Sequence, residues 1–149
     1  MDYLLAFLWA LPSGILWFFN AEVFVYLRVS QTDAVPWLIA LVVTCGQFIG
    51  YFVLFMLADR FIAKLGFVRR ALEKVQLRRV GRASYVVFAT GGLCGIPPLL
   101  GLFTLYGSAR VIPFWKLACA AMPMRLVWYL VWAYSPDFMC DHLGLCITP

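Results

Sequence analysis

The sequence ASYVVFATGGLCGIPPLLGLFTLYGSA, residues 83–109, is apolar throughout but is interrupted near its middle by Gly95-Ile96-Pro97-Pro98. Proline removes a backbone donor and clashes with the preceding turn, so the pattern predicts two helical pieces of about 11 or 12 residues, each roughly 17 Å long. Neither piece can cross a hydrocarbon core about 30 Å thick. Broken helices at membrane depth line protein-enclosed or wet cavities, and transporters build substrate sites there. The interruption therefore predicts a re-entrant hairpin with a binding site at its break.

The composition indicates an integral membrane protein. Hydrophobic residues make up 64% of the 149 residues and charged residues only 13%, which is too apolar for a single soluble core. The start Met1-Asp2 is acidic and no Lys or Arg precedes Arg28, whereas a secretory signal peptide begins with basic residues. We therefore expect the first apolar segment to be retained, in a multi-pass protein of the plasma or inner membrane.

Hydropathy divides the chain into four apolar segments, which are Tyr3–Leu27, Val35–Ala58, Ala83–Ala109 and Trp115–Tyr134. Val35–Ala58 is long, uncharged and uninterrupted, so it predicts a spanning helix. Trp115–Tyr134 is the second candidate, although it contains Pro123 and Arg125 near its middle. The first segment resembles the third because Pro12-Ser13-Gly14 interrupts it.

The two halves of the chain follow the same order, which predicts two inverted repeats. In each half an interrupted segment leads through an apolar-Pro-aromatic step, either Val35-Pro36-Trp37 or Ile112-Pro113-Phe114, into a spanning helix. We expect a single all-α membrane domain with a first repeat (1–58), a basic amphipathic interfacial helix (59–82), a second repeat (83–134) and a tail (135–149). Each repeat would be a re-entrant helical hairpin plus a transmembrane helix. Four full spans are the alternative, and they would move the C-terminus from outside to inside.

The segment 59–82 carries most of the positive charge. Its eight Lys and Arg residues exceed its two acidic residues by six, and apolar residues recur on one face at helical spacing. This predicts an interfacial helix on the cytoplasmic leaflet that contacts anionic lipid headgroups. A topology signal alone is the other interpretation, and no nucleic-acid recognition module accompanies the charge. The predicted membrane-surface residues are Lys64, Arg69, Arg70, Lys74, Arg78 and Arg79.

Polar residues at membrane depth are the candidate site. Glu22, with Asn20 beside it, lies in the first segment, and Arg125 lies in the last one. The helical piece after Pro98 would direct unpaired N–H groups at a phosphate, with Arg125 as the opposed cation. Glu22 would then compete with the phosphate for Arg125. A static Glu22–Arg125 ion pair that fixes helix register is the competing interpretation. The predicted headgroup or ion site comprises Glu22, Arg125, Asn20, Gly95, Pro97 and Pro98.

Several of these residues carry a resemblance to a known family. Gly95-Ile-Pro-Pro98, followed by Tyr106-Gly-Ser-Ala-Arg110, Pro113-Phe114 and Arg125, resembles the second half of the DedA superfamily, also called the VTT or SNARE-associated Golgi protein domain, and is most similar to its small YqaA-like branch. Glu22 falls where such proteins carry an acidic residue in the first re-entrant loop.

The resemblance implies a transporter or scramblase that moves a phospholipid or a polyprenyl phosphate across the bilayer through opposed re-entrant hairpins. The alternative is a non-transporting membrane scaffold or interaction protein that packs, for example as a homo-oligomer, through Gly46, Gly50 and the neighbouring small residues.

An enzyme, a metal site and a cofactor are not expected. Paired acids or histidines at membrane depth, which lipid-phosphate chemistry would need, are missing from the sequence. Cys140, His142 and Cys146 lie close together in the tail, but their spacing matches no closed four-ligand zinc pattern. The two tail cysteines would form a disulfide if the tail is outside and stay free thiols if it is inside.

Overall fold

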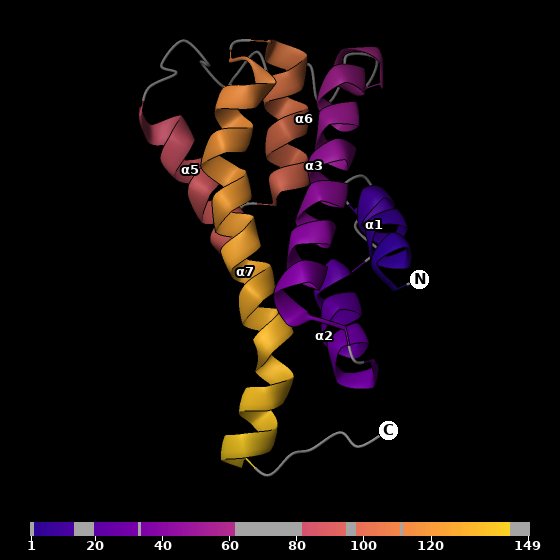
Figure 1. The fold of residues 1–149 in the computed structure, drawn as a ribbon. Coiled ribbons are helices and arrows are strands. Elements are labelled where there is room, and N and C mark those ends of the chain that lie inside the picture. The colour runs from indigo at the N-terminus through magenta and orange to yellow at the C-terminus, as the bar shows by residue number, and fades with distance from the viewer. Residues whose placement is uncertain are drawn as a thin grey trace. The chain divides into compact units, whose positions relative to one another are not determined.

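The computed structural model is helical over the residues that it describes, which are 2–13, 20–32, 34–61, 82–94, 98–110 and 112–143. Its elements in chain order are α1 (Asp2–Ser13), α2 (Ala21–Gln31), α3 (Pro36–Phe61), α5 (Arg82–Cys94), α6 (Leu99–Ala109) and α7 (Phe114–Leu143), as Figure 1 shows. The prediction of an all-α chain is confirmed for these residues.

Among the described residues, two helices are long and apolar enough to cross a membrane. They are Pro36–Ala58 in α3, with 23 residues, and Phe114–Ser135 in α7, with 22 residues. Both coincide with the segments that the sequence predicted as spans. The apolar helices Tyr3–Ser13, Ala83–Cys94 and Leu99–Ala109 are shorter than the roughly 20 residues that a crossing requires.

The helix α7 extends beyond the predicted start of the tail. It continues through Ser135 as far as Leu143, so the first nine residues of the segment 135–149 are helical. Pro123 also lies inside this helix without ending it. Two other prolines lie at helix starts, where proline is expected. Pro36 is the first residue of α3, and Pro113 directly precedes α7.

The predicted interruptions coincide with helix ends. Helix α1 ends at Ser13 and α2 begins at Ala21, while α5 ends at Cys94 and α6 begins at Leu99. Residues 14–19 and 95–97 lie outside the described part of the chain. In each pair the two short helices pack against each other, α1 with α2 and α5 with α6. The described helices therefore follow the order short, short, long twice along the chain.

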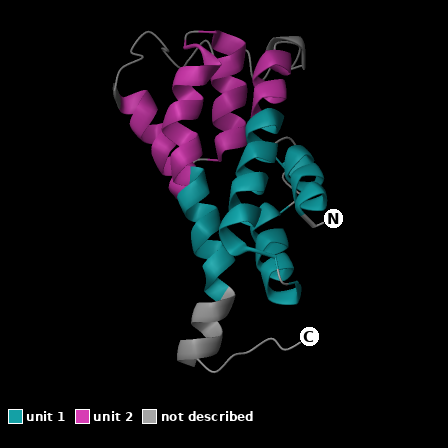
Figure 2. Ribbon diagram, in the orientation of Figure 1, with its two compact units in different colours: residues 1–50, 125–149 teal, residues 51–124 magenta. Residues whose placement is uncertain are grey.

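The chain divides into two compact units (Figure 2). Unit 1 comprises Met1–Gly50 and Arg125–Pro149, and unit 2 comprises Tyr51–Met124. Each unit thus contains one pair of short helices, the first part of one long helix and the last part of the other. The boundaries of these units cut across those of the predicted repeats, because each long helix contributes to both units.

Small residues form most of the core of unit 1. Ala10 is fully buried, and a Cβ added at Gly46 would lie 2.8 Å from its Cβ and 2.8 Å from the Phe7 carbonyl oxygen. Only glycine lets α1 approach α3 this closely, which is typical of helices that pack inside a membrane. The core cluster consists of Ala6, Ala10, Ala21, Val25, Ile39, Ala40, Val43, Tyr129 and Ala133.

Aromatic rings fill unit 2. Phe103 on α6 is fully buried, and its ring centroid lies 5.0 Å from that of Tyr51, 5.0 Å from that of Phe88 and 5.3 Å from that of Phe114. These separations are those of attractive ring pairs. Glycines again mark the closest helix contacts, since a Cβ added at Gly107 would lie 2.6 Å from the Phe55 carbonyl oxygen.

Candidate functional site

An ion pair joins α2 and α7 within unit 1. Arg125 Nη2 donates to Glu22 Oε1 over 2.7 Å. The Arg125 side chain is 9% exposed and that of Glu22 is 21% exposed. The structure therefore brings together the two charges that the sequence had singled out, although 103 residues separate them along the chain.

The helix start holds Glu22 in place. Asn20 is the N-cap of α2, and its Oδ1 accepts hydrogen bonds from the backbone N–H groups of Glu22 at 3.0 Å and Val23 at 3.3 Å. A carboxylate in the first turn also faces the positive end of the helix dipole. Asn20 itself is exposed. In the structure this predicted site residue is a helix cap that positions Glu22.

A chain of buried polar groups holds Arg125 from the other side. Arg125 Nε donates to Gln47 Oε1 over 3.2 Å, and Gln47 Nε2 donates to Ser13 Oγ over 3.0 Å. Ser13 Oγ in turn donates to the Ala10 carbonyl oxygen over 2.6 Å. Gln47 and Ser13 are both buried, so helices α1, α3 and α7 share one hydrogen-bonded network around the guanidinium group.

Aromatic side chains from α7 complete the surroundings of the pair. Trp128 Nε1 donates to Glu22 Oε1 over 3.1 Å. The Arg125 Cζ atom lies 4.8 Å from the centroid of the buried Tyr129 ring, a favourable cation–π position. Two N–H donors, from Arg125 and Trp128, thus converge on a single carboxylate oxygen.

The ion pair could serve as an anion-exchange site or as a static lock between two helices. The pair is neutral as a whole, which lowers the cost of keeping an arginine among apolar helices. An incoming anionic group that displaces the carboxylate would meet the same two donors and the same cation. A static pair that locks α2 to α7 would use the same contacts. Substitutions that separate stability from transport distinguish the two possibilities.

The remaining predicted headgroup residues lie in the second half. Gly95 and Pro97 fall outside the described residues. Pro98 is the N-cap of α6 and makes no side-chain cap hydrogen bond, in contrast to Asn20 at the start of α2. It belongs to unit 2, whereas Glu22, Asn20 and Arg125 belong to unit 1.

The predicted membrane-surface residues also lie outside the described part of the chain. They are Lys64, Arg69, Arg70, Lys74, Arg78 and Arg79. The tail residue Cys146 is also outside the described part of the chain. Among the described residues, no group of three or more His, Cys, Asp or Glu side chains is placed to hold a metal ion.

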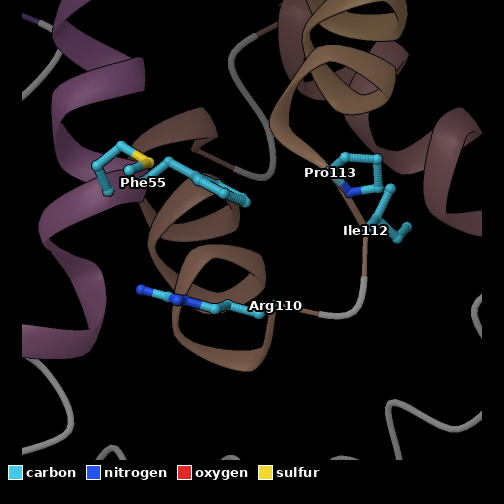
Figure 3. A pocket seen from close by; sticks show the side chains of 5 residues that line it. Phe55, Arg110, Ile112 and Pro113 are labelled. Atoms are coloured by element: carbon cyan, nitrogen blue, oxygen red, sulfur yellow. The ribbon is translucent and has the colours of Figure 1, made fainter.

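A shallow pocket in unit 2 contains Arg110. Its volume is about 340 Å³, and Figure 3 shows Phe55 on α3 and Arg110, Ile112 and Pro113 on the connection between α6 and α7 around it, with Met56 also in its lining. Arg110 caps the C-terminus of α6 in a left-handed conformation (φ 48°), and its backbone N–H donates to the Tyr106 carbonyl oxygen. An arginine at the end of an apolar helix is typically an interface anchor, whose aliphatic part lies along apolar surface.

Sequence reasoning missed Gln47 and the roles of Ser13, Trp128 and Tyr129. Gln47 carried a usable signal, because a polar side chain in the middle of the most apolar segment needs a buried partner. Ser13 was read only as part of the interruption at Pro12–Gly14. The two aromatic residues gave no signal, since the sequence is rich in aromatic residues throughout.

Comparisons with known proteins add no relative, since no protein-family model, no curated protein and no solved structure matches this chain.

Proposed function

We propose that the chain is an integral membrane protein of the DedA-like type that moves a phosphate-bearing lipid across the bilayer. The observation that carries the proposal is the buried Glu22–Arg125 pair, with its hydrogen bonds to Gln47 and Trp128, in a unit otherwise lined by apolar side chains. An ionisable pair at such a position is a functional site by default in a membrane protein. Its donors suit a phosphate group.

A membrane location is supported by the two helices that can span a bilayer. Large apolar side chains are also exposed along the helices, which favours a lipid environment over water. Examples are Leu4, Leu8, Trp37, Met56, Val86, Trp115 and Val131. The basic segment 59–82 then assigns the connection between the halves to the cytoplasmic side. The site would open to lipid headgroups that arrive from either leaflet.

The composition of the two units supports inverted repeats. Unit 1 takes the first part of α3 and the last part of α7, and unit 2 takes the last part of α3 and the first part of α7. A two-fold exchange of this kind is expected when two copies of one short-short-long motif assemble with opposite orientation. We therefore propose that α1–α2 and α5–α6 are the two re-entrant hairpins.

The scaffold alternative is less well supported. It relies on Gly46, Gly50 and the neighbouring small residues as a surface for a partner helix. Gly46 is buried against Ala10 and Phe7 of α1 in the same unit, so its packing surface is already occupied.

Lipid translocation in reconstituted vesicles tests the proposal. We expect Arg125→Met combined with Glu22→Gln to abolish protein-dependent translocation of a labelled phospholipid while the protein stays folded, because the double change leaves no unpaired buried charge. Arg28→Met is the matched control, since Arg28 is a second arginine of unit 1, with its Cζ atom 5.7 Å from the centroid of the Phe24 ring. Undiminished translocation by the folded double variant would refute the headgroup site and favour a static pair.

A further inference from the structure

We propose that Gln47 clamps Arg125 in place while Glu22 exchanges with a single negative charge, so that the site selects phosphodiester headgroups over phosphomonoesters. This inference rests on the proposed function and names the substrate class of the same site.

The clamp follows from the direction of the hydrogen bonds. Ser13 Oγ donates to the Ala10 carbonyl oxygen, so its lone pair accepts from Gln47 Nε2. That contact turns Gln47 Oε1 toward Arg125, where it accepts from Nε. Gln47 is 2% exposed and Ser13 8%. The Arg125 guanidinium group is therefore buried and is held, before any ligand binds, by hydrogen bonds that reach Gln47 on α3 and Ser13 on α1.

The Glu22 side is the one suited to exchange. Its side chain is more exposed than that of Arg125, at 21% against 9%. Its Oε1 receives both the Arg125 Nη2 bond at 2.7 Å and the Trp128 Nε1 bond at 3.1 Å. If the carboxylate turns away, both donors face one vacated oxygen position. A non-bridging phosphate oxygen can accept the same two bonds.

The charge of the network sets the class of ligand. Among the described side chains of the network, Arg125 is the only cation and Glu22 the only anion. A phosphodiester carries one negative charge, so it gives Arg125 one anionic partner in place of another while the displaced Glu22 carboxylate turns to its more exposed side. A phosphomonoester carries about −1.5 to −2 at pH 7, which leaves uncompensated charge among apolar helices and repels the displaced carboxylate more strongly.

The test compares labelled lipids that share their acyl chains and differ in headgroup, in vesicles containing the wild-type protein. The probes are phosphatidylglycerol, phosphatidic acid and a neutral glycolipid without phosphate. We expect phosphatidylglycerol to move at least about tenfold faster than phosphatidic acid and the glycolipid to stay at the protein-free rate, since one excess like charge or a missing phosphate disfavours binding. Equal rates for the two phosphates, or rapid glycolipid movement, would overturn the selectivity while leaving lipid transport intact. If no lipid moves, the proposed function itself fails.

Two substitutions make the test specific to the clamp and to the charge. Glu22→Gln removes the repelling carboxylate, so the ratio of phosphatidic acid to phosphatidylglycerol movement should rise about tenfold. Gln47→Glu places a permanent carboxylate at Arg125 Nε and should reduce phosphatidylglycerol movement about tenfold or more, whereas Gln47→Met loosens the arginine without adding charge and should reduce it less. Thermal unfolding in detergent verifies that each variant is folded. An unchanged lipid ratio in folded Glu22→Gln, or wild-type movement in folded Gln47→Glu, would contradict the proposal.

Discussion

Units 1 and 2 each contain two short helices and part of each long helix, but different side chains fill their cores. Unit 1 surrounds a charged pair with a hydrogen-bonded chain and packs its helices through alanines. Unit 2 places aromatic rings in its centre, where Phe103 meets Tyr51, Phe88 and Phe114. Helices inside a membrane gain little from the hydrophobic effect, so they are held by close packing and by polar contacts. Unit 1 combines close packing with a polar network, whereas the centre of unit 2 is packed by aromatic rings.

The difference suggests that unit 1 carries the proposed anion site and that unit 2 supports the fold. The rings that interlock around Phe103 at 5.0–5.3 Å carry no charge, and they resist rearrangement. Under the proposed function, the network of donors in unit 1 would instead have two discrete states, one with the Glu22 carboxylate bound to Arg125 and one with a ligand anion bound. We therefore expect unit 1 to be sensitive to charge and unit 2 to be sensitive to volume, and the following substitutions test that expectation.

Loss of the arginine alone should have the largest effect. We expect Arg125→Met to lower the free energy of unfolding by about 3–5 kcal/mol, because Glu22 is left as a partly buried charge without its cation. The measurement is unfolding of the purified protein in detergent, followed by circular dichroism.

The neutral double variant sharpens this result. Adding Glu22→Gln to Arg125→Met should restore most of the lost free energy, since no charge is then left unpaired. A double variant as unstable as Arg125→Met would show that unit 1 depends on the arginine for packing and that the contrast between the units is wrong.

Removal of a ring should have the next largest effect. We expect Phe103→Ala to lower the free energy of unfolding by about 3 kcal/mol, because the fully buried ring contacts three others and leaves a cavity. Phe52→Ala is the control, since Phe52 is 36% exposed. Equal losses for the two variants would count against an aromatic core as the support of unit 2.

Added methyl groups should destabilise both units to a similar, smaller degree. We expect Gly46→Ala in unit 1 and Gly92→Ala in unit 2 each to cost about 1–3 kcal/mol, because the new Cβ would meet the Phe7 carbonyl in one case and the Ala121 carbonyl in the other. Gly101→Ala is the matched control, since its Cβ would lie 3.9 Å from the nearest atom, Pro98 Cγ. If unit 1 tolerates the methyl group and unit 2 does not, close packing is a property of unit 2 alone.

Loss of the cap should have the smallest effect on stability. We expect Asn20→Ala to cost about 1 kcal/mol, because the N–H groups of Glu22 and Val23 lose their acceptor. Asn20→Asp retains the acceptor and is the control. Lipid translocation by Asn20→Ala should fall more than this small loss implies if the cap also aims Glu22 at Arg125.

Much of the helical layout could be predicted from the sequence. The segment with no charge and no interruption predicted α3, and the prolines at positions 36 and 113 marked the starts of the long helices. The interruptions at Pro12–Gly14 and Gly95–Pro98 coincide with helix ends because proline and glycine act locally. The end of α7 was not predicted, because the apolar segment ends at Tyr134 whereas the helix continues to Leu143.

The site could be predicted only in part. Glu22 and Arg125 were found because opposite charges in apolar segments require partners. Gln47 and Ser13 join them only because three helices meet at one point, and no local pattern encodes that meeting. The exchange of helix parts between the units is likewise a property of the folded chain, since each half of the sequence reads as a self-contained repeat.

The distance along the chain between the two charged partners has a consequence for biosynthesis. Glu22 is made 103 residues before Arg125. At about 5–20 residues per second, roughly 5–20 seconds pass before the cation can reach the bilayer. In the proposed membrane protein, the nascent first segment would therefore be held by the insertion machinery, or wait at the membrane surface, with its acid in water. Membrane entry of the N-terminal helices would then be completed only after α7 has left the ribosome, so that a truncated chain lacking α7 would be recognised by its unpaired glutamate.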